Sequence, residues 1–577
     1  MTMSPDERRR RMRDALNRSS LRRNKGAANE DEISFDFSRK DETVDENAEN
    51  NETDQQEPQL INIKEAETER EEMLKAEASE AAAENDKNTE EKHENPQKSQ
   101  DGRKKAALKK AADSRADRRV FAGALGILIL AVLVLCAKGM FGSGQNDPGN
   151  GTAQNESPDA AAAESESAAK ELSIMEQAQL KYAQYDYDGS VDLLKTLTDY
   201  DSNTEAQELA AKCVETKATL VEQDINEITH VFFHILCVDP ENSFDKSKWG
   251  KQADGYNSLM TTIDEFKKMI QEMYDKGYVL VSIRDMAHPV ENADGSISME
   301  KGSIMLPPGK KAFVMSEDDV CYYEYMEGAG YADKMIVGDD GRPTLHYTDA
   351  DGKEHVGDYD LVGVLDSFID EHPDFSYKGH KACLVFTGYN GILGYRTDES
   401  YDPNSEYYDD TLEKGHDVEA ERREAVKVLK ALVADGYDVG SHSWGHRDLG
   451  NISMDRFKKD CDRWNRNVAS LIKEATGEQP DIIIYPRGAD IADWHGYDHS
   501  NERFDYLFNL GFRYYCNVDS SEYWVQLGSD YLRQGRRALD GYNMWNDIGK
   551  GYNRLGDLFD NVSEIFDPAR PTPVPGY

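Results

Sequence analysis

Short apolar runs alternate with amphipathic stretches along the second half of the chain, from about residue 228 onward. Patterns typical of buried strands occur in THVFFHILCV, GYVLVSI, KAFVMS, KACLVFTG, YDVGSH and DIIIYP. Between them, helical spacing of apolar positions occurs in TTIDEFKKMIQEMYDKG and EAVKVLKALVADG. Strands that alternate with helices predict an α/β fold in which helices wrap parallel strands, either as a barrel or as an open sheet.

The first part of the chain has a different pattern. Residues 1–118 are dense in charge and poor in aromatic residues, so they cannot bury enough apolar surface to offset the entropy of ordering. We predict a disordered tail there. The segment 119–141 contains an uncharged apolar run from Val120 to Ala137, which is long enough to cross a bilayer. Because more than a hundred residues precede this run, a transmembrane helix is favoured over a cleaved signal peptide.

The charges around this run predict its orientation. Basic residues crowd its N-terminal side, whereas Gly, Asn, Ser and Asp dominate the sequence after Lys138. The positive-inside rule then places the N-terminus in the cytoplasm and the C-terminal part outside the cell. We therefore expect a single-pass protein of the cell membrane, with a topology that suits a bacterial envelope.

Three further segments complete the predicted organisation. Residues 142–167 have the composition of a flexible stalk. Residues 168–224 have a helical pattern that resembles one tetratricopeptide-like hairpin, and a spacer packed on the next domain is favoured over a partner-binding repeat. Residues 551–577 are predicted to be a C-terminal tail.

Composition narrows the classes of function. The chain has 577 residues, which is too long for one ordinary domain. Its formal net charge of −43 would repel the phosphates of nucleic acid. We therefore expect no nucleic-acid partner. The seven cysteines have no paired CxxC spacing, and several lie in strand-like runs. Buried free thiols are favoured over a disulfide framework.

Candidate chemistry follows three of the predicted strands. Asp318 and Asp319 come after KAFVMSE, His442 and His446 lie in SHSWGH, and the third strand is followed by YPRGAD. In a parallel barrel, functional groups gather at the carboxyl ends of the strands. Histidines four apart and neighbouring aspartates are also common on ordinary surfaces, so spacing alone leaves both interpretations open.

Two imidazoles and one carboxylate, if they meet, suit a divalent cation such as Zn²⁺ that keeps open positions for water. The cation would lower the pKa of that water and polarise a carbonyl group, while a second carboxylate takes the proton. This chemistry hydrolyses amides and esters.

The order SEDDV, SHSWGH and YPRG resembles the polysaccharide deacetylase family, also called the NodB homology domain or carbohydrate esterase family 4. The entry FFHILCVDP and the helix after it are also similar to that family. The resemblance covers about residues 228–550, with an insertion at about 333–376. It implies a distorted (β/α)₇-type barrel and a hydrolase that removes acetyl groups from an acetylated polysaccharide or peptidoglycan.

The resemblance also implies roles for single residues. Asp318 becomes the base, and Asp319, His442 and His446 become ligands of a divalent metal, Zn²⁺ with Co²⁺ or Ni²⁺ as alternatives. The backbone N–H of Arg487 would stabilise the oxyanion. The substrate-binding positions that we predict are Tyr485, Pro486, Trp444, Asp519 and Trp524.

Some positions depart from the family pattern. Glu317 and Val320 stand where Phe and Gly are usual, and Arg487 where an aromatic residue is common. No histidine follows His499, although the family's last motif normally supplies one as general acid. His495 and His499 are candidate replacements. Alternatively, one of three basic residues could form a charge pair with Asp318: Arg533, Arg536 or Arg537.

Two alternatives stay open from the sequence. A catalytically inactive glycan-binding or scaffold module would keep the fold and lose the late histidine. The insertion, with its turn-rich strand pattern, either roofs the substrate groove or is a structural addition, and the roof is slightly favoured. A two-histidine oxygenase is disfavoured because the metal ligands occur in the opposite order along the chain.

Overall fold

The computed structural model describes residues 172–519 and 521–576. The predicted tail (1–118), transmembrane helix (119–141) and stalk (142–167) lie outside the described residues. Among the helices of the described part, none is long and apolar enough to cross a membrane.

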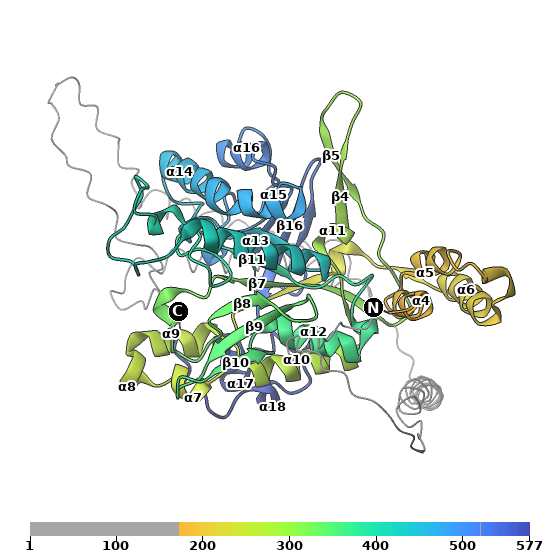
Figure 1. The fold of residues 1–577 in the computed structure, drawn as a ribbon, viewed down its shortest axis with the longest axis horizontal. Coiled ribbons are helices and arrows are strands. Elements are labelled where there is room, and N and C mark those ends of the chain that lie inside the picture. The colour runs from red at the N-terminus through yellow and green to blue at the C-terminus, as the bar shows by residue number, and fades with distance from the viewer. Residues whose placement is uncertain (1–171, 520, 577) are drawn as a thin grey trace, which may run out of the picture. The chain divides into compact units, whose positions relative to one another are not determined.

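Seven parallel strands close into a barrel in the middle of the domain (Figure 1). Each strand pairs with the next one around the ring, and β7 pairs with both β2 and β11, which closes it. In order, the ring contains β2 (Thr229–His234), β7 (Lys311–Asp318), β11 (Cys383–Phe386), β12 (Asp438–Ser441), β13 (Ile482–Ile484), β14 (Tyr514–Val518) and β16 (Leu532–Ala538). The closed ring confirms the barrel and excludes the open sheet.

Short strands extend the barrel at its rim. β3 (Tyr278–Leu280) pairs with β7 in parallel, and β15 (Val525–Leu527) pairs with β16 in the antiparallel direction. Two small antiparallel pairs lie elsewhere: β1 (Val221–Glu222) with β6 (Met305–Leu306), and the hairpin of β4 (Ala287–Glu291) and β5 (Ile297–Lys301).

Helices surround the strands on both sides in Figure 1. Helix α10 (Ile263–Asp275) shows why: Thr262 and Glu265 form a capping box at its start, and its apolar residues recur at helical spacing on one buried face. The other helices of the barrel domain are α7 (Pro240–Ser243), α8 (Lys246–Trp249), α9 (Lys251–Leu259), α11 (Ile283–Met286), α12 (Leu361–Glu371), α13 (Val418–Ala434), α14 (Met454–Trp464), α15 (Ser470–Thr476), α16 (Glu502–Asn509), α17 (Gly541–Lys550) and α18 (Val562–Ile565).

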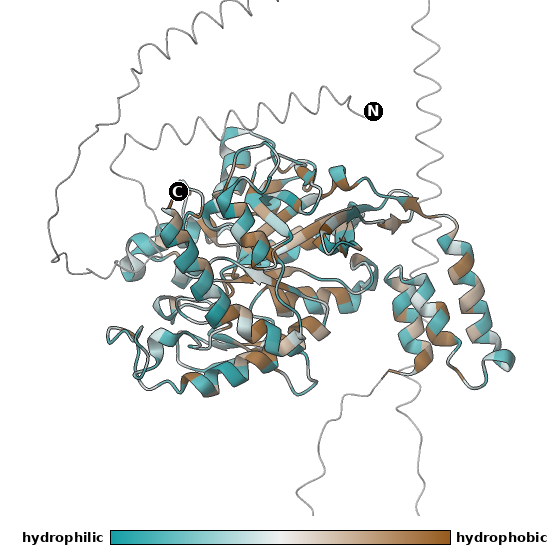
Figure 2. Ribbon diagram, turned by 90° about the horizontal axis from the view of Figure 1, so that it is seen from above, coloured by the Kyte–Doolittle hydropathy of each residue, from teal (hydrophilic) through white to brown (hydrophobic). Residues whose placement is uncertain are grey.

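Alternating strand residues supply two apolar cores. In β13, Ile482 and Ile484 join the core inside the barrel, whereas Ile483 joins the core between barrel and helices. Because both faces are buried, the strand is a continuous apolar run, and each isoleucine contributes about 1.5–3 kcal/mol by burial. Figure 2 shows the same pattern, with apolar residues on the strands and hydrophilic residues on the outer helix faces.

Three helices occupy the segment predicted as a spacer: α4 (Ile174–Ala183), α5 (Tyr187–Leu194) and α6 (Thr204–Lys217). They contact the barrel domain next to α12. The hydroxyl of Tyr185 donates to the carbonyl oxygen of Asp374 at 2.7 Å, and the N–H of Lys378 donates to the carbonyl oxygen of Gln184 at 2.7 Å.

The insertion forms a three-stranded antiparallel sheet of β8 (Lys334–Val337), β9 (Pro343–Thr348) and β10 (Glu354–Gly357). This sheet packs against α12 and α13. Arg342, in the turn between β8 and β9, lies 2.6 Å from Asp370 at the end of α12 and 3.3 Å from Asp435 just after α13. These contacts anchor the insertion on α12 and α13, and its role as a roof for the groove stays a prediction.

The segment predicted as a C-terminal tail packs against the barrel domain, with Val574 buried and the carbonyl oxygen of Pro575 bonded to Ser258. Arg570 and Glu265 form a fully buried ion pair, with Nη2 and Oε2 2.6 Å apart. The carbonyl oxygen of Pro571 accepts a hydrogen bond from Asn257 at 2.8 Å. The short, proline-rich sequence gives no periodic signal, so only these contacts with α9 and α10 reveal its place.

Candidate active site

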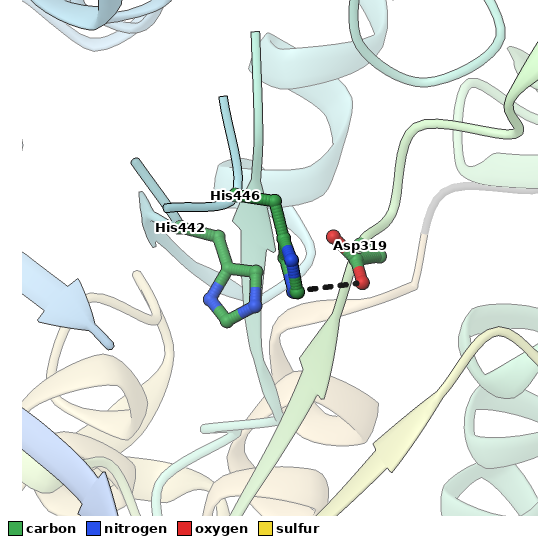
Figure 3. A group of neighbouring side chains, drawn as sticks. All are labelled: Asp319, His442 and His446. Atoms are coloured by element: carbon green, nitrogen blue, oxygen red, sulfur yellow. Dashed lines mark ion pairs between the residues drawn. The ribbon is translucent and has the colours of Figure 1, made fainter. Parts of the chain in front are cut away.

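The residues singled out by the sequence meet at the carboxyl ends of β7 and β12. Figure 3 shows the side chains of Asp319, His442 and His446 turned toward one another. One potential ligand atom from each of these three buried residues lies within 4.8 Å of the other two. Asp319 and His446 have positive φ angles of 60° and 51°, so the convergence needs backbone conformations that non-glycine residues seldom adopt.

His442 is held as a neutral imidazole. Its Nδ1–H donates to the carbonyl oxygen of Ile484 at 2.9 Å, because a carbonyl can only accept. Its Nε2 therefore carries the lone pair on the side of the acids, 3.9 Å from Asp318 Oδ2. Burial lowers the pKa of His442 to about 4, against the opposing effect of the two aspartates. A neutral, oriented imidazole is the form that binds a metal ion.

His446 is neutral for similar reasons. Burial lowers its pKa to about 3, and the nearby charges of Arg487 and His234 add to this effect. Its Nε2 lies 3.8 Å from Asp319 Oδ2.

Asp319 is fixed by a tyrosine. The hydroxyl of Tyr323 donates to Asp319 Oδ1 at 2.6 Å and lies 2.7 Å from the hydroxyl of Thr387. One carboxylate oxygen is thus anchored, while the other is the one that lies nearer His446. Hydrogen-bonded ligands of this kind are typical of preorganised metal sites.

Asp318 forms a buried, two-pronged ion pair with Arg536 of β16. Its Oδ1 and Oδ2 accept hydrogen bonds from Nη1 at 2.7 Å and Nη2 at 2.9 Å. Burial by itself raises the pKa of this carboxyl, but the guanidinium outweighs it and holds the pKa at about 2. Asp318 is therefore a carboxylate at any physiological pH. Of the three arginines considered from the sequence, Arg536 is the partner.

The other two arginines have different partners. Arg533 donates through Nη2 to Asp490 at 2.7 Å and to the carbonyl oxygen of Asp493 at 2.6 Å, which ties down the loop after β13. Arg537 pairs with Asp557 at 2.8 Å.

The third loop, after β13, places Pro486 in a buried position and Arg487 in a left-handed conformation with a φ of 59°. The Arg487 side chain is exposed. Tyr485 is fully buried, and its hydroxyl lies 3.1 Å from that of Tyr497. Its ring packs in the core, and its contact with substrate stays a prediction.

The remaining predicted substrate-binding residues also support other residues. Trp524 is 4% exposed, and the guanidinium of Arg533 lies 4.8 Å from its ring centre. Trp444 donates through Nε1 to Asp398 at 2.8 Å, and the guanidinium of Arg463 lies 3.6 Å from its ring centre. Trp524 is buried and Trp444 is half-buried, and contact of either ring with a sugar stays a prediction.

Asp519 follows β14 and is buried beside β16. Its N–H donates to the carbonyl oxygen of Arg536 at 2.9 Å, and its carboxylate accepts from the N–H of Ser521 at 2.7 Å. Its described contacts thus lie within this loop and next to the partner of Asp318.

One functional candidate was missed in the sequence. His234, the last residue of β2, stands beside Asp318 in the parallel register. It interacts electrostatically with Asp318, His446 and Asp540. Its position at the end of FFH, the first strand of the barrel, was the available signal. By contrast, His495 is an exposed side chain paired with Asp493, and the exposed His499 lies 2.8 Å from Asp505 and 2.9 Å from Asp530.

The donor set fits a divalent cation. One anchored carboxylate and two neutral imidazoles leave room for exchangeable ligands, which suits Zn²⁺, Co²⁺ or Ni²⁺. A closed parallel barrel with acids, imidazoles and a guanidinium at its carboxyl edge has the organisation of a barrel enzyme.

Comparison with known proteins finds a family match over part of the barrel domain. Residues 406–513 match the family model described as polysaccharide deacetylase, which confirms the predicted resemblance. The matched stretch contains both histidines and the loop at Arg487. It does not include Asp318, Asp319 or Arg536, whose place in the site comes from the structure.

A curated relative from Geobacillus stearothermophilus, described as an uncharacterized 30.6 kDa protein in the fumA 3′ region, is 36% identical over 84 residues. The alignment covers 13% of this chain and 30% of that protein.

Three solved structures are similar at low identity. The Streptococcus pyogenes deacetylase PplD in complex with acetate is 14% identical, with coverage of 56% of this chain and 95% of that one and a TM-score of 0.29. IcaB from Ammonifex degensii is 11% identical, with coverage of 57% and 97% and a TM-score of 0.27. The BpsB deacetylase domain from Bordetella bronchiseptica is 12% identical, with coverage of 55% and 98% and a TM-score of 0.26.

Proposed function

We propose that residues 228–550 form a metal-dependent deacetylase that removes acetyl groups from an acetylated envelope polysaccharide or peptidoglycan. The observation that carries the proposal is the convergence of Asp319, His442 and His446 within 4.8 Å, with the ionised Asp318 beside them. The family match over residues 406–513 supports the substrate class.

The residues of the chain have separate roles in this proposal. A divalent cation, when bound by Asp319, His442 and His446, would activate water and polarise the acetyl carbonyl group. Asp318 accepts the proton of the attacking water on its carboxylate, and Arg536 keeps that carboxylate ionised and oriented. The N–H of Arg487 donates to the oxyanion of the tetrahedral intermediate.

The leaving amine needs a proton, and we assign this role to His234. It lies at the same edge of the barrel as Asp318 and interacts with Asp540. An imidazole on the first strand would thus replace the histidine that the family's last motif lacks in this chain.

The cellular setting is proposed from the sequence. The apolar run within 119–141 and its basic N-terminal flank support a single transmembrane helix, with the deacetylase domain outside the cell. Such an anchor would keep the site close to envelope glycans.

Acetate release tests the proposed activity. The full chain, loaded with Zn²⁺ or Co²⁺, should release acetate from acetylated chito-oligomers or peptidoglycan. Asp318→Asn should lower kcat by about 10²–10⁴-fold, because the general base is lost, while zinc stays bound. His442→Ala should lose stoichiometric zinc. Asp351→Asn, an exposed position in the insertion, is the matched control and should match the wild type.

The result also separates the alternative function. Glycan binding without acetate release, across metals and substrates, would favour an inactive glycan-binding or scaffold module. Acetate release that persists in Asp318→Asn would contradict the role of Asp318 as the base.

A further inference from the structure

Both candidate histidine ligands belong to one tight turn, and a buried aspartate that the sequence analysis did not single out holds that turn. Asp460 of α14 is 6% exposed. Its Oδ1 accepts a hydrogen bond from the N–H of Trp444 at 2.8 Å, and its Oδ2 accepts one from the N–H of Gly445 at 2.9 Å. These two N–H groups lie between His442 and His446 in the chain.

The other side of the turn is bonded as well. The carbonyl oxygen of Trp444 accepts from the N–H groups of Gly388 at 2.9 Å and Tyr389 at 3.1 Å, in the loop after β11. The peptide groups between the two ligands are thus fixed from opposite sides. Such support is needed, because Ser443 and His446 both have positive φ angles, of 58° and 51°, which non-glycine residues adopt only when their surroundings impose them.

Helix α14 is itself tied to the ligands. The carbonyl oxygen of Phe386 accepts from Trp464 Nε1 at 2.9 Å and also from the N–H of His442 at 2.9 Å. Helix α14, which carries Asp460, and His442 are therefore bonded to the same carbonyl group. A Cβ on Gly445 would lie 3.1 Å from Asp460 Oδ2, so the turn approaches the carboxylate closely.

The sequence of α14 shows that Asp460 occupies a place where a packing residue is usual. Its buried positions are Phe457, Asp460, Cys461 and Trp464, which form one helical stripe. A carboxylate in an apolar stripe is costly unless hydrogen bonds compensate for its burial. The bonds to the turn provide that compensation.

We propose that Asp460 is a positioning residue that preorganises the turn between His442 and His446 and thereby sets the affinity for the metal ion. The inference rests on the proposed metal-dependent function and adds a residue that touches neither substrate nor metal. Losses of this kind of supporting contact typically weaken metal binding about 10–100-fold.

Zinc titration of the full chain tests the proposal. Asp460→Asn keeps the volume but turns an amide N–H₂ toward one of the two N–H donors, so one hydrogen bond is lost. We expect its Kd for Zn²⁺ to rise about 10–100-fold, and the visible spectrum of the Co²⁺ form to change. The matched control is Asp462→Asn, an exposed position on the same helix, which should bind Zn²⁺ like the wild type.

The outcomes are distinguishable. A Kd of Asp460→Asn close to that of the wild type overturns the positioning role, even if the variant is less stable, and leaves the metal site standing. A wild-type chain that binds no divalent cation overturns the proposed function together with this inference. If the variant does not fold, hydrogen exchange of the metal-free wild type decides. We expect slow exchange at the N–H groups of Trp444 and Gly445, and exchange as fast as at exposed loops overturns the proposal.

Discussion

The two ends of the barrel both bury charged residues but use them differently. At the amino end, Lys381 is 5% exposed and donates to Asp366 and Asp435, each at 2.6 Å. At the carboxyl end, Arg536 pairs with Asp318. Beside them, the potential metal-ligand atoms of Asp319, His442 and His446 lie close together. At the amino end, buried ion pairs hold helices and strands together. At the carboxyl end, lone pairs are concentrated at a place where a cation can bind.

Backbone conformation differs in degree, because more non-glycine residues have positive φ angles at the carboxyl end than near Lys381, where Lys378 has one of 56°. Asp319, Ser443, His446 and Arg487 have positive φ angles and lie at the ends of β7, β12 and β13. Residues held in such conformations cluster at functional sites because the surrounding contacts impose them. The carboxyl edge of the barrel thus carries local strain, which is offset by the hydrogen bond that Tyr323 donates to Asp319 and by the one that Asp460 accepts from the N–H of Trp444.

The largest expected effect is a loss of stability from a substitution at the amino end of the barrel. Lys381→Met should lower the free energy of unfolding by about 3–5 kcal/mol, because the buried Asp366 loses the amine that bonds it at 2.6 Å and keeps the more distant guanidinium of Arg342, 3.6 Å away. Chemical denaturation measures the loss, and zinc titration should show an unchanged Kd. Burial raises the pKa of Asp366 to about 7, so the loss should be smaller near pH 5, where that carboxyl is neutral, than near pH 8.

The matched control for Lys381→Met is Lys427→Met on α13. Lys427 is an exposed residue that pairs with Glu424 at 2.8 Å, and its loss should cost less than about 1 kcal/mol. A weaker Kd for zinc in Lys381→Met would show that the two ends of the barrel are coupled.

An intermediate effect concerns the carboxyl end alone. Tyr323→Phe removes the hydroxyl that holds Asp319 and keeps the ring, so we expect the Kd for Zn²⁺ to rise about 10-fold or more. Titration of the variant beside Tyr274→Phe, which loses a partly buried hydroxyl bonded to Asp374, measures the difference. Equal affinities in the two variants would remove Tyr323 from the support of the site.

The smallest effect is the pH dependence of metal binding. Protons compete with a cation only as the pH falls toward the pKa values of the imidazoles, which are about 4 for His442 and about 3 for His446. Between about pH 7.5 and pH 5.5 the Kd for Zn²⁺ should therefore change less than about threefold. Two ordinary imidazoles with a pKa of about 6.5 would lose roughly 100-fold, and calorimetry at both pH values separates these outcomes.

The sequence predicted which residues gather at the carboxyl edge of the barrel, because their signal is local. Asp319, His442 and His446 follow apolar strands, and the carboxyl ends of parallel strands meet at one edge of a barrel. The supporting residues gave a weaker signal. His234 stands at a strand end without a motif, and Asp460 looks like any charged residue of a helix until its neighbours are known. Tyr485 and Trp524 were predicted to bind sugar, and both are buried. The type of a residue does not reveal which side of a loop faces solvent.

The sequence by itself determined the α/β pattern, the buried strands and the residues that gather at the barrel edge, since these follow from apolar periodicity and short motifs. Only the tertiary structure decided that Arg536 pairs with Asp318. On β16, the side chains of Leu532, Gln534 and Arg536 face into the barrel, and those of Arg533 and Arg537 face outward. Which of the two sets faces inward depends on the pairing register of β16 with β2 and β14. Long-range pairing sets that register, and no property of the local sequence RQGRRA carries it.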